Sequence, residues 1–452
     1  ASSWCASCQK VEIKAVNNES SEDIVDLQER TVEGSVLVSA TLTKSQNAAE
    51  AIDEALAEIK AGADKLLADN VEKIETPREI NLGLWEALGM DIETYRITYR
   101  TVGGKAKKEL DGTVSYQPIV LSGDIAFIRN TNGKFRRRLE SVTLYHTQFN
   151  SDEGMTTIAE PGLIPFRTAY NALVVYPHFQ GVFINSGVNT INLSETMLKA
   201  RQALDCELAA LEFIESLDDV EMAEGYYTEV MGVSNGSGSA LATHYLLENE
   251  LMELNREKIN LKGTFCAEGC YSYSDLIEDF VSKDLDHTFQ LPFKLKEGST
   301  LSEIIEEVAN YTNLANMKPA FYISLICSAY QTWKDVYFKD IALADYFSEE
   351  FYNKKYGDGP ETILEKYLNG GLDVFDCGDE LGIESIVNPK ILKDGDIDLE
   401  SKEAKVLLRA YQENDRPIYQ NWHPASPIVF AHSKGDEFCS YENMLRIYDA
   451  TS

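Results

Sequence analysis

The stretch that decides the fold runs from Tyr227 to Leu251 and reads YTEVMGVSNGSGSALATHYLLENEL. Its first seven residues are typical of a β-strand, the last fifteen are typical of a helix, and GVSNG at residues 232–236 separates them. A serine on so sharp a strand-to-helix turn needs small neighbours, because the backbone there is strained. The pattern predicts that Ser234 is a nucleophile, with the N–H of Asn235 and the helix N-terminus directed at a developing oxyanion.

A phosphate-binding loop is the alternative interpretation, because the glycines at 236 and 238 also open the helix. The chain contains neither G-x-x-x-x-G-K-[ST] nor G-x-G-x-x-G. A strand before the motif and a helix directly after it favour the hydrolase interpretation.

Short apolar strands alternate with amphipathic helices on both sides of this stretch. Strands are predicted at residues 34–42, 95–102, 114–128, 142–147, 172–177, 227–233, 261–267 and 426–433. A helix is predicted from near Thr43, with Gln46 completing a capping box, and another from Glu195 to about Leu217. The alternation predicts an α/β fold, a mostly parallel sheet with helices on both faces.

The alternation stops after residue 267 and returns near residue 426, which predicts an inserted helical cap. We therefore expect five segments, listed in chain order: a polar tether at 1–30, a strand-helix extension at 31–94, the first part of a hydrolase core at 95–273, the cap at 274–404, and the second part of the core at 405–452.

The charge of the chain excludes one class of partner. Asp and Glu number 74 against 41 Lys and Arg, for a net charge of −33, which repels phosphate backbones and argues against nucleic acid. The acidic run at 394–398 lacks the Gly and Glu of a calcium loop, since Leu399 and Lys405 stand there. We therefore expect no cofactor and no metal, and a small-molecule substrate.

The beginning of the chain raises the question of location. Ala6-Ser7-Cys8 has the small-small-Cys form of a bacterial lipoprotein processing site, which would place a lipid anchor at Cys8. A disordered terminus with incidental cysteines is the alternative. The lipoprotein interpretation predicts a secreted, periplasmic or cell-surface protein. In such an oxidising setting Cys266 and Cys270 can pair, although buried apolar cysteines are the favoured interpretation.

From about Tyr95 onward the sequence resembles the α/β-hydrolases of the secretory lipase kind and their Bacteroidetes lipoprotein relatives. The resemblance depends mainly on GVSNGSG at the turn and on NWHPASPIVFAHSKGDEFCSYEN at 421–443. It implies that Ser234 is the nucleophile and Asp436 the triad acid. It also implies that Thr147 and Gln148 lie in the loop that gives the second oxyanion donor, although the family favours Gly where Thr147 stands.

The triad histidine is the missing part. In this fold the order along the chain is Ser, acid, His, and none of the six histidines follows Asp436. We expect a truncated sequence, in which Met444 and Ile447 are incompletely covered, and a carboxylic ester hydrolase whose histidine lies outside this chain. The alternatives are a serine peptidase and a non-catalytic surface binding protein on the same scaffold.

Overall fold

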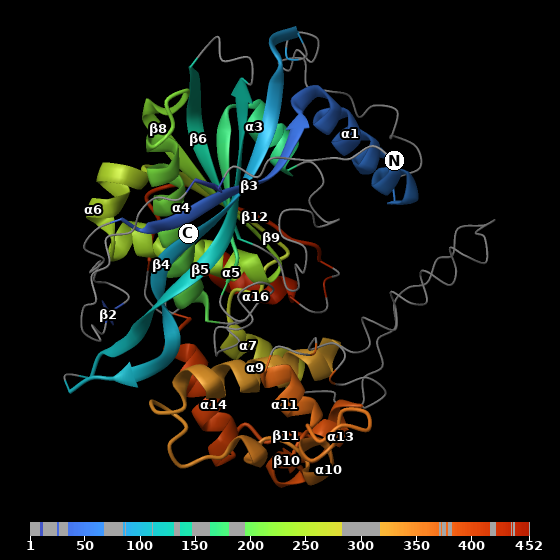
Figure 1. Ribbon diagram of the computed structural model, residues 1–452. Helices are drawn as coiled ribbons and strands as arrows, with labels where there is room; N and C mark the ends of the chain where they lie inside the picture. Colours follow the sequence, from blue (N-terminus) through green and yellow to red (C-terminus); the bar gives the residue numbers. More distant parts are fainter. Residues whose placement is uncertain are drawn as a thin grey trace.

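The computed structural model describes residues 10–11, 25–26, 35–66, 85, 87–110, 112–130, 136–146, 163–179, 195–282, 317–369, 372, 377, 382–415, 422–434, 436 and 439–451. Its main strands are β1 (Lys10–Val11), β2 (Val25–Asp26), β3 (Leu37–Asn47), β4 (Met90–Lys108), β5 (Val114–Asn130), β6 (Arg137–His146), β7 (Ala172–Pro177), β8 (Val220–Val233), β9 (Leu261–Ala267) and β12 (Ile428–Ala431). They form one sheet in the order β1-β3-β4-β5-β7-β6-β8-β9-β12, with β2 paired to β5 (Figure 1).

The sheet has two halves of different character. Strands β7, β6, β8, β9 and β12 run parallel. On the other side, β3, β4, β5 and β7 pair antiparallel. Parallel strands need both faces covered, and their ends gather at one edge of the sheet. The turn at Ser234 therefore lies in the parallel half.

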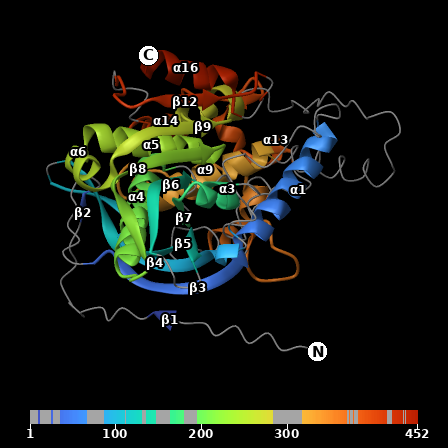
Figure 2. The same ribbon diagram turned by 90° about the horizontal axis from the view of Figure 1, so that it is seen from above.

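Helices cover both faces of the sheet. They are α1 (Ala48–Leu66), α3 (Leu163–Ala169), α4 (Thr196–Glu215), α5 (Asn235–Asn249), α6 (Met252–Leu254), η3 (Asn255–Ile259) and α16 (Tyr441–Thr451) (Figure 2). In β7, Val174 packs in one apolar cluster with residues of α1 and α3. Its neighbours Leu173 and Val175 pack in another cluster with residues of α4, α5 and α16. Because side chains alternate along a strand, the two clusters lie on opposite faces. The predicted fold class is confirmed.

The start of α1 differs from the prediction. β3 continues to Asn47, and the helix begins at Ala48. The Asn47 side chain accepts the N–H groups of Ala49 and Glu50 at 3.0 and 3.3 Å, so Asn47 caps the helix. The predicted capping box does not form, because the Thr43 hydroxyl donates instead to the carbonyl of Thr94 across the sheet.

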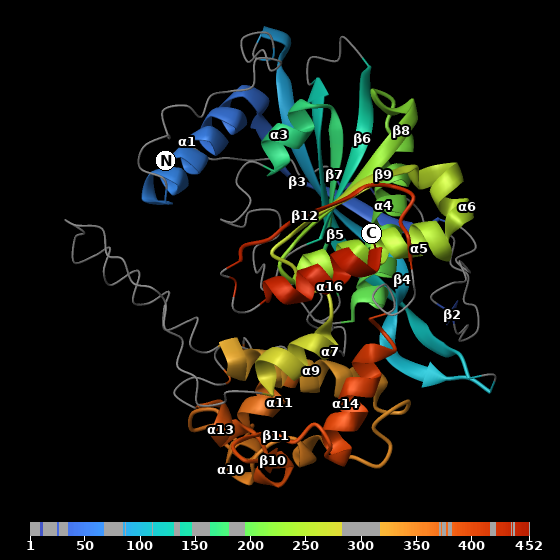
Figure 3. The ribbon, with the colours of Figure 1, turned by 180° about the vertical axis from the view of Figure 1, so that it is seen from behind.

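A second layer lies at one end of the sheet (Figure 3). Its described elements are α7 (Tyr273–Leu276), η4 (Ile277–Val281), α9 (Met317–Trp333), η5 (Leu343–Asp345), α10 (Glu349–Tyr352), α11 (Ile363–Leu368), α13 (Ile383–Ile386), η6 (Pro389–Ile391), the hairpin β10 (Leu392–Lys393) with β11 (Asp396–Ile397), and α14 (Lys402–Gln412). The hairpin is a sheet of its own. α14 continues across the boundary expected at residue 404. None of the described helices combines the length and apolarity that crossing a membrane requires.

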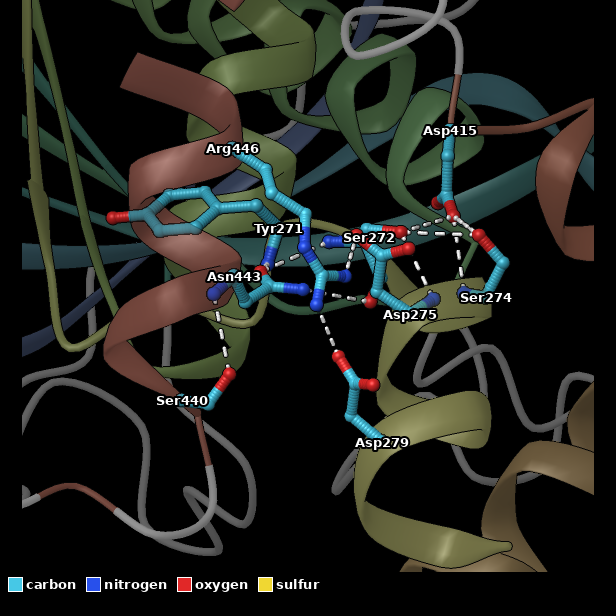
Figure 4. A network of polar contacts seen from close by, with 9 residues as sticks. All are labelled: Tyr271, Ser272, Ser274, Asp275, Asp279, Asp415, Ser440, Asn443 and Arg446. Atoms are coloured by element: carbon cyan, nitrogen blue, oxygen red, sulfur yellow. Dashed lines mark hydrogen bonds and ion pairs between the residues drawn. The ribbon is translucent and has the colours of Figure 1, made fainter. Parts of the chain in front are cut away.

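A polar joint connects this cap to the core (Figure 4). Asp415, just after α14, accepts hydrogen bonds from the hydroxyl groups of Ser272 and Ser274 at 3.1 and 2.9 Å. Asn443 of α16 accepts the N–H of Ser272 at 3.4 Å, and Arg446 forms ion pairs with acids of α7 and η4. The chain therefore enters and leaves the cap at one place, where it also contacts α16.

The packing of α16 contradicts one expectation. Met444 is 7% exposed and Ile447 is 0% exposed, so neither is incompletely covered. Both belong to the main apolar cluster. The large apolar residues that are exposed here are Val429 on β12 and Leu445 and Tyr448 on α16.

Candidate active site

Ser234 lies on the strained turn that the sequence predicts. It follows β8 directly and is the residue before α5, with φ 53° and ψ −123°. Side chains other than glycine rarely adopt a positive φ, and such strain is typical of functional sites. The turn is fixed from the neighbouring strand: the N–H of Ser234 donates to Ala267 at 2.8 Å, and its carbonyl accepts the N–H of Cys270 at 3.3 Å.

The glycines around Ser234 are required by close backbone approach. A Cβ on Gly232 would lie 2.4 Å from the carbonyl oxygen of Gly236 and 2.8 Å from the Cα of Ser237. A Cβ on Gly238 would lie 2.4 Å from the carbonyl oxygen of Cys270. These contacts are with backbone atoms, which cannot move aside cheaply. The spacing of glycines in the motif therefore has a steric cause.

The loop after β12 carries Asp436. β12 pairs with β9, and β9 pairs with β8, so a single strand separates the Asp436 loop from the Ser234 turn. Glu268, the residue after β9, also has a positive φ of 47°, and its N–H donates to Ala431 at the end of β12. The Glu268 carboxylate accepts the N–H of Ser433 at 3.0 Å. Three neighbouring strand ends are thereby joined at one edge.

A disulfide connects the two loops. Cys270, in the loop that touches Ser234, is bonded to Cys439, whose N–H donates to the Asp436 carboxylate at 3.0 Å. The suggested pairing of Cys266 with Cys270 is wrong. Cys266 is a free, buried cysteine on β9, as the favoured interpretation expects. Cys270 is instead covalently tied to the acid-bearing loop.

His432 lies beside Asp436. Its Nε2 is 3.8 Å from the Asp436 carboxylate and 3.9 Å from that of Glu268. These three side chains offer one nitrogen and two oxygens within 4.8 Å of one another, a set that suits a divalent cation. However, His432 is hydrogen-bonded through Nε2 to the carbonyl of Cys439, and backbone N–H groups bind both carboxylates. Hydrogen bonding within the loop accounts for the cluster without a metal.

His146 lies in the core, fully buried at the end of β6. The two ring nitrogens of His146 lie 3.0 Å from the hydroxyl of Ser239 and 3.2 Å from that of Thr243. Burial, assisted by the nearby positive charge of Lys199, lowers the pKa of His146 to about 3, so its ring is neutral. His146 therefore has a structural role. Within the described part of the chain, no histidine is hydrogen-bonded to the Ser234 hydroxyl.

The oxyanion donors are only partly described. Asn235 is the first residue of α5, and the N–H groups of a first helical turn have no acceptor within the helix. That the Asn235 N–H points toward a developing oxyanion stays a prediction. Thr147 and Gln148, predicted to give the second donor, lie outside the described residues.

Beneath Asn235 lies a buried polar network that the sequence motifs did not indicate. The ammonium of Lys199 on α4 donates to the Asn235 side-chain oxygen, and the Asn235 side-chain nitrogen donates to the hydroxyl of Tyr273. Burial lowers the pKa of Lys199 to about 7 and raises that of Glu195, one turn earlier, to about 7. The spacing of four residues on one helix was the only signal in the sequence.

The order β4-β5-β7-β6-β8-β9-β12, with a serine turn after β8 and an acid after β12, completes the architecture. Solved structures share the overall fold. The ligand-bound esterase LipA from Xanthomonas oryzae, which degrades rice cell walls, matches with a TM-score of 0.56 at 14% identity over 92% of this chain and 87% of that one. The chain has the α/β-hydrolase fold.

A second α/β-hydrolase neighbour is a presumed hydrolase from Legionella pneumophila. It matches with a TM-score of 0.56 at 15% identity, over 92% of this chain and 88% of that one. No family model and no curated protein sequence matches. Structural similarity at such low sequence identity establishes the fold alone, so the activity has to be argued from the site.

Proposed function

We propose that this α/β-hydrolase protein is a serine hydrolase of carboxylic esters. In this mechanism the Ser234 oxygen attacks the ester carbonyl carbon, and the tetrahedral intermediate then expels the alcohol and leaves an acyl-enzyme that water hydrolyses. The N–H of Asn235 stabilises the oxyanion, and Asp436 orients the imidazole that moves the proton. The observation that carries the proposal is the positive φ of Ser234 at the N-terminus of α5.

The surroundings of Ser234 support ester chemistry in a second way. The acid loop is held one strand away by the disulfide and by Glu268, on the side where an imidazole between serine and acid would lie. A general base must lie within hydrogen-bond distance of both the Ser234 hydroxyl and the Asp436 carboxylate. We assign this imidazole to a residue other than the described histidines. A peptidase would use the same groups on an amide bond.

A fluorophosphonate probe tests the proposal directly, because it forms a bond only with an activated serine. We expect the full-length protein to be labelled at Ser234, as located by mass spectrometry of the labelled peptide, and to hydrolyse p-nitrophenyl acetate. Ser234→Ala should abolish both. Ser45→Ala is the matched control, since Ser45 is an exposed serine on β3, several strands away from β8, and should leave both unchanged. An unlabelled protein that hydrolyses no ester would favour the non-catalytic binding protein.

We also propose that the protein works in an oxidising location, secreted or at the cell surface. The disulfide between Cys270 and Cys439 supports this, because such bonds persist mainly outside the reducing cytosol. The lipid anchor proposed at Cys8 lies outside the described residues. Metabolic labelling with an alkyne fatty acid, compared between the natural protein and Cys8→Ala, should show label only on the former.

A further inference from the structure

Lys199 is an ammonium group inside the core of the molecule. It is 2% exposed, lies on α4, and sits 5.0 Å from the centre of the Phe179 ring. Removing a charged amine from water is unfavourable unless the charge is compensated, and such groups concentrate at functional sites. Its hydrogen bond goes to Asn235, the residue after the nucleophile.

We propose that Lys199 is a positioning residue for the oxyanion site. Through the Asn235 side chain it fixes the first turn of α5, and its positive charge lies behind the donor that faces the substrate oxygen. This rests on the proposed function, in which that oxygen gains negative charge as Ser234 attacks. Preorganised charge in a site that excludes water stabilises such an oxyanion strongly.

The neighbours of Lys199 come from several elements, and each restricts its position. Glu195 of α4 lies one turn before it, and the Glu195 carboxylate accepts a hydrogen bond from Ser328 of the cap at 2.7 Å. His146 of β6 is neutral, as described above, and its ring stacks on Phe179 with centres 5.8 Å apart. Tyr273 of α7 holds the other end of the Asn235 amide. The network thus joins the core strands, the turn and the cap.

Among the described residues, the titratable groups placed beside Lys199 or its partner Asn235 include Glu195, His146 and Tyr273. His146 carries no charge above about pH 3, and burial raises the pKa of Tyr273 well above its usual range, so both stay neutral near pH 7. The pKa values of Glu195 and Lys199 both lie near 7, so raising the pH through 7 ionises the Glu195 carboxyl group and removes the positive charge of Lys199. The support that Lys199 gives the oxyanion should therefore weaken as the pH rises through about 7.

Lys199→Met tests the proposal, with Arg201→Met as the matched control. Arg201 is equally buried on the same helix, but its guanidinium pairs with Asp205, 3.2 Å away. We expect kcat of Lys199→Met for p-nitrophenyl acetate to fall about ten- to a hundredfold, with KM changed less than about threefold. The decline in kcat of the natural enzyme above about pH 7 should be absent. Tm should fall by no more than in Arg201→Met, because the Asn235 side-chain oxygen loses a hydrogen-bond donor while Arg201→Met leaves the buried Asp205 carboxylate without its guanidinium.

A second measurement does not depend on turnover. Acetate, the carboxylate product of an acetyl ester, should bind the natural protein and bind Lys199→Met about tenfold more weakly, as measured by calorimetry at constant ionic strength. Arg201→Met should bind acetate normally.

The outcomes separate this inference from the proposed function. Ester hydrolysis with equal kcat and acetate affinity in both proteins would overturn the role of Lys199 and leave the function intact. Lys199-dependent acetate binding without ester hydrolysis would overturn the function and leave the anion site. Neither activity nor binding in the natural protein would overturn both. An equal loss of kcat in Arg201→Met would reduce Lys199 to a structural residue.

Discussion

The turn at Ser234 and the loop at Asp436 flank the same strand, β9, but are held in different ways. The Ser234 turn is shaped by its own neighbours, since the missing Cβ of Gly232 allows the strand and helix backbones to touch within five residues. The Asp436 loop is held by residues far away in the sequence. Its disulfide spans 169 residues, and the Ser433–Glu268 hydrogen bond spans 165.

The difference teaches which changes each loop can tolerate. A turn in which two backbone segments touch is disrupted when a Cβ atom is added between them, because the backbone cannot move to relieve the clash. A loop built on distant links can lose one of them and move while the rest of the fold remains. We therefore expect changes at the turn to alter the nucleophile itself, and changes at the links to alter only the alignment of the acid.

Asp436→Asn should have the largest effect. An amide cannot stabilise the imidazolium that forms as Ser234 attacks, so kcat for p-nitrophenyl acetate should fall about 10³- to 10⁴-fold. Glu268→Gln is the matched control, because this carboxylate lies in the same cluster and serves the loop backbone. It should lower kcat less than about tenfold. Equal losses in the two variants would remove the distinction between the acid and its support.

Loss of the disulfide between Cys270 and Cys439 should have the second largest effect. The double variant Cys270→Ser, Cys439→Ser should lower the free energy of unfolding by about 4 kcal/mol, because the unfolded chain is no longer crosslinked over a long loop. Urea denaturation measures it, and the natural protein treated with a reductant should behave in the same way. Phosphonate labelling of Ser234 should slow but persist. A double variant as stable as the natural protein would mean that the acid loop is held without the bond.

Gly232→Ala tests the turn. The added Cβ would meet backbone atoms of α5, so we expect a loss of about 3 kcal/mol in the free energy of unfolding, together with loss of labelling at Ser234. Gly225→Ala on the same strand is the control. Gly225 has a φ of 73° but open space around its Cβ position, and should cost only about 1 kcal/mol. An equal loss in the free energy of unfolding for the two variants would show that close packing at the turn is unimportant.

Replacement of Asp415, in the joint beside α16, should have the smallest effect on ester hydrolysis, but it should change how the stability of the protein depends on pH. Burial raises its pKa to about 7 from 3.8, so the folded protein keeps a proton that the unfolded chain releases. As the pH rises from about 4 to about 7, the free energy of unfolding of the natural protein should fall relative to that of Asp415→Asn, and should then stay level. A flat difference would mean that the three hydrogen bonds it accepts keep Asp415 ionised.

Much of the fold could be predicted because the central strands are short, apolar and bounded by clear breaks. β7 and β9 begin and end where the sequence predicts. β3 and β4 are longer than predicted, since polar residues at their ends are paired in the sheet by partners that periodicity cannot reveal. The start of α1 was misplaced because Asn47, and not Thr43, bonds the free N–H groups.

The candidate site divides in the same way. Ser234 and Asn235 could be found because a local motif with a steric cause contains them. The disulfide, Glu268 and Lys199 could not, because their roles depend on which strand ends lie side by side. The covered faces of Met444 and Ile447 were missed for that reason too: α16 packs against the cap joint, a contact between segments that are distant in sequence.

The joint at Asp415 also has a consequence for how the molecule can change over time. Because Ser272 and Ser274 at the start of the cap touch Asp415 at its end, the chain enters and leaves the cap at neighbouring points of the core. A module attached in this way can be exchanged for one of a different size without rerouting the sheet. The strand ends that carry Ser234 and Asp436 can then be combined with caps of different sizes while the joint at Asp415 stays the same.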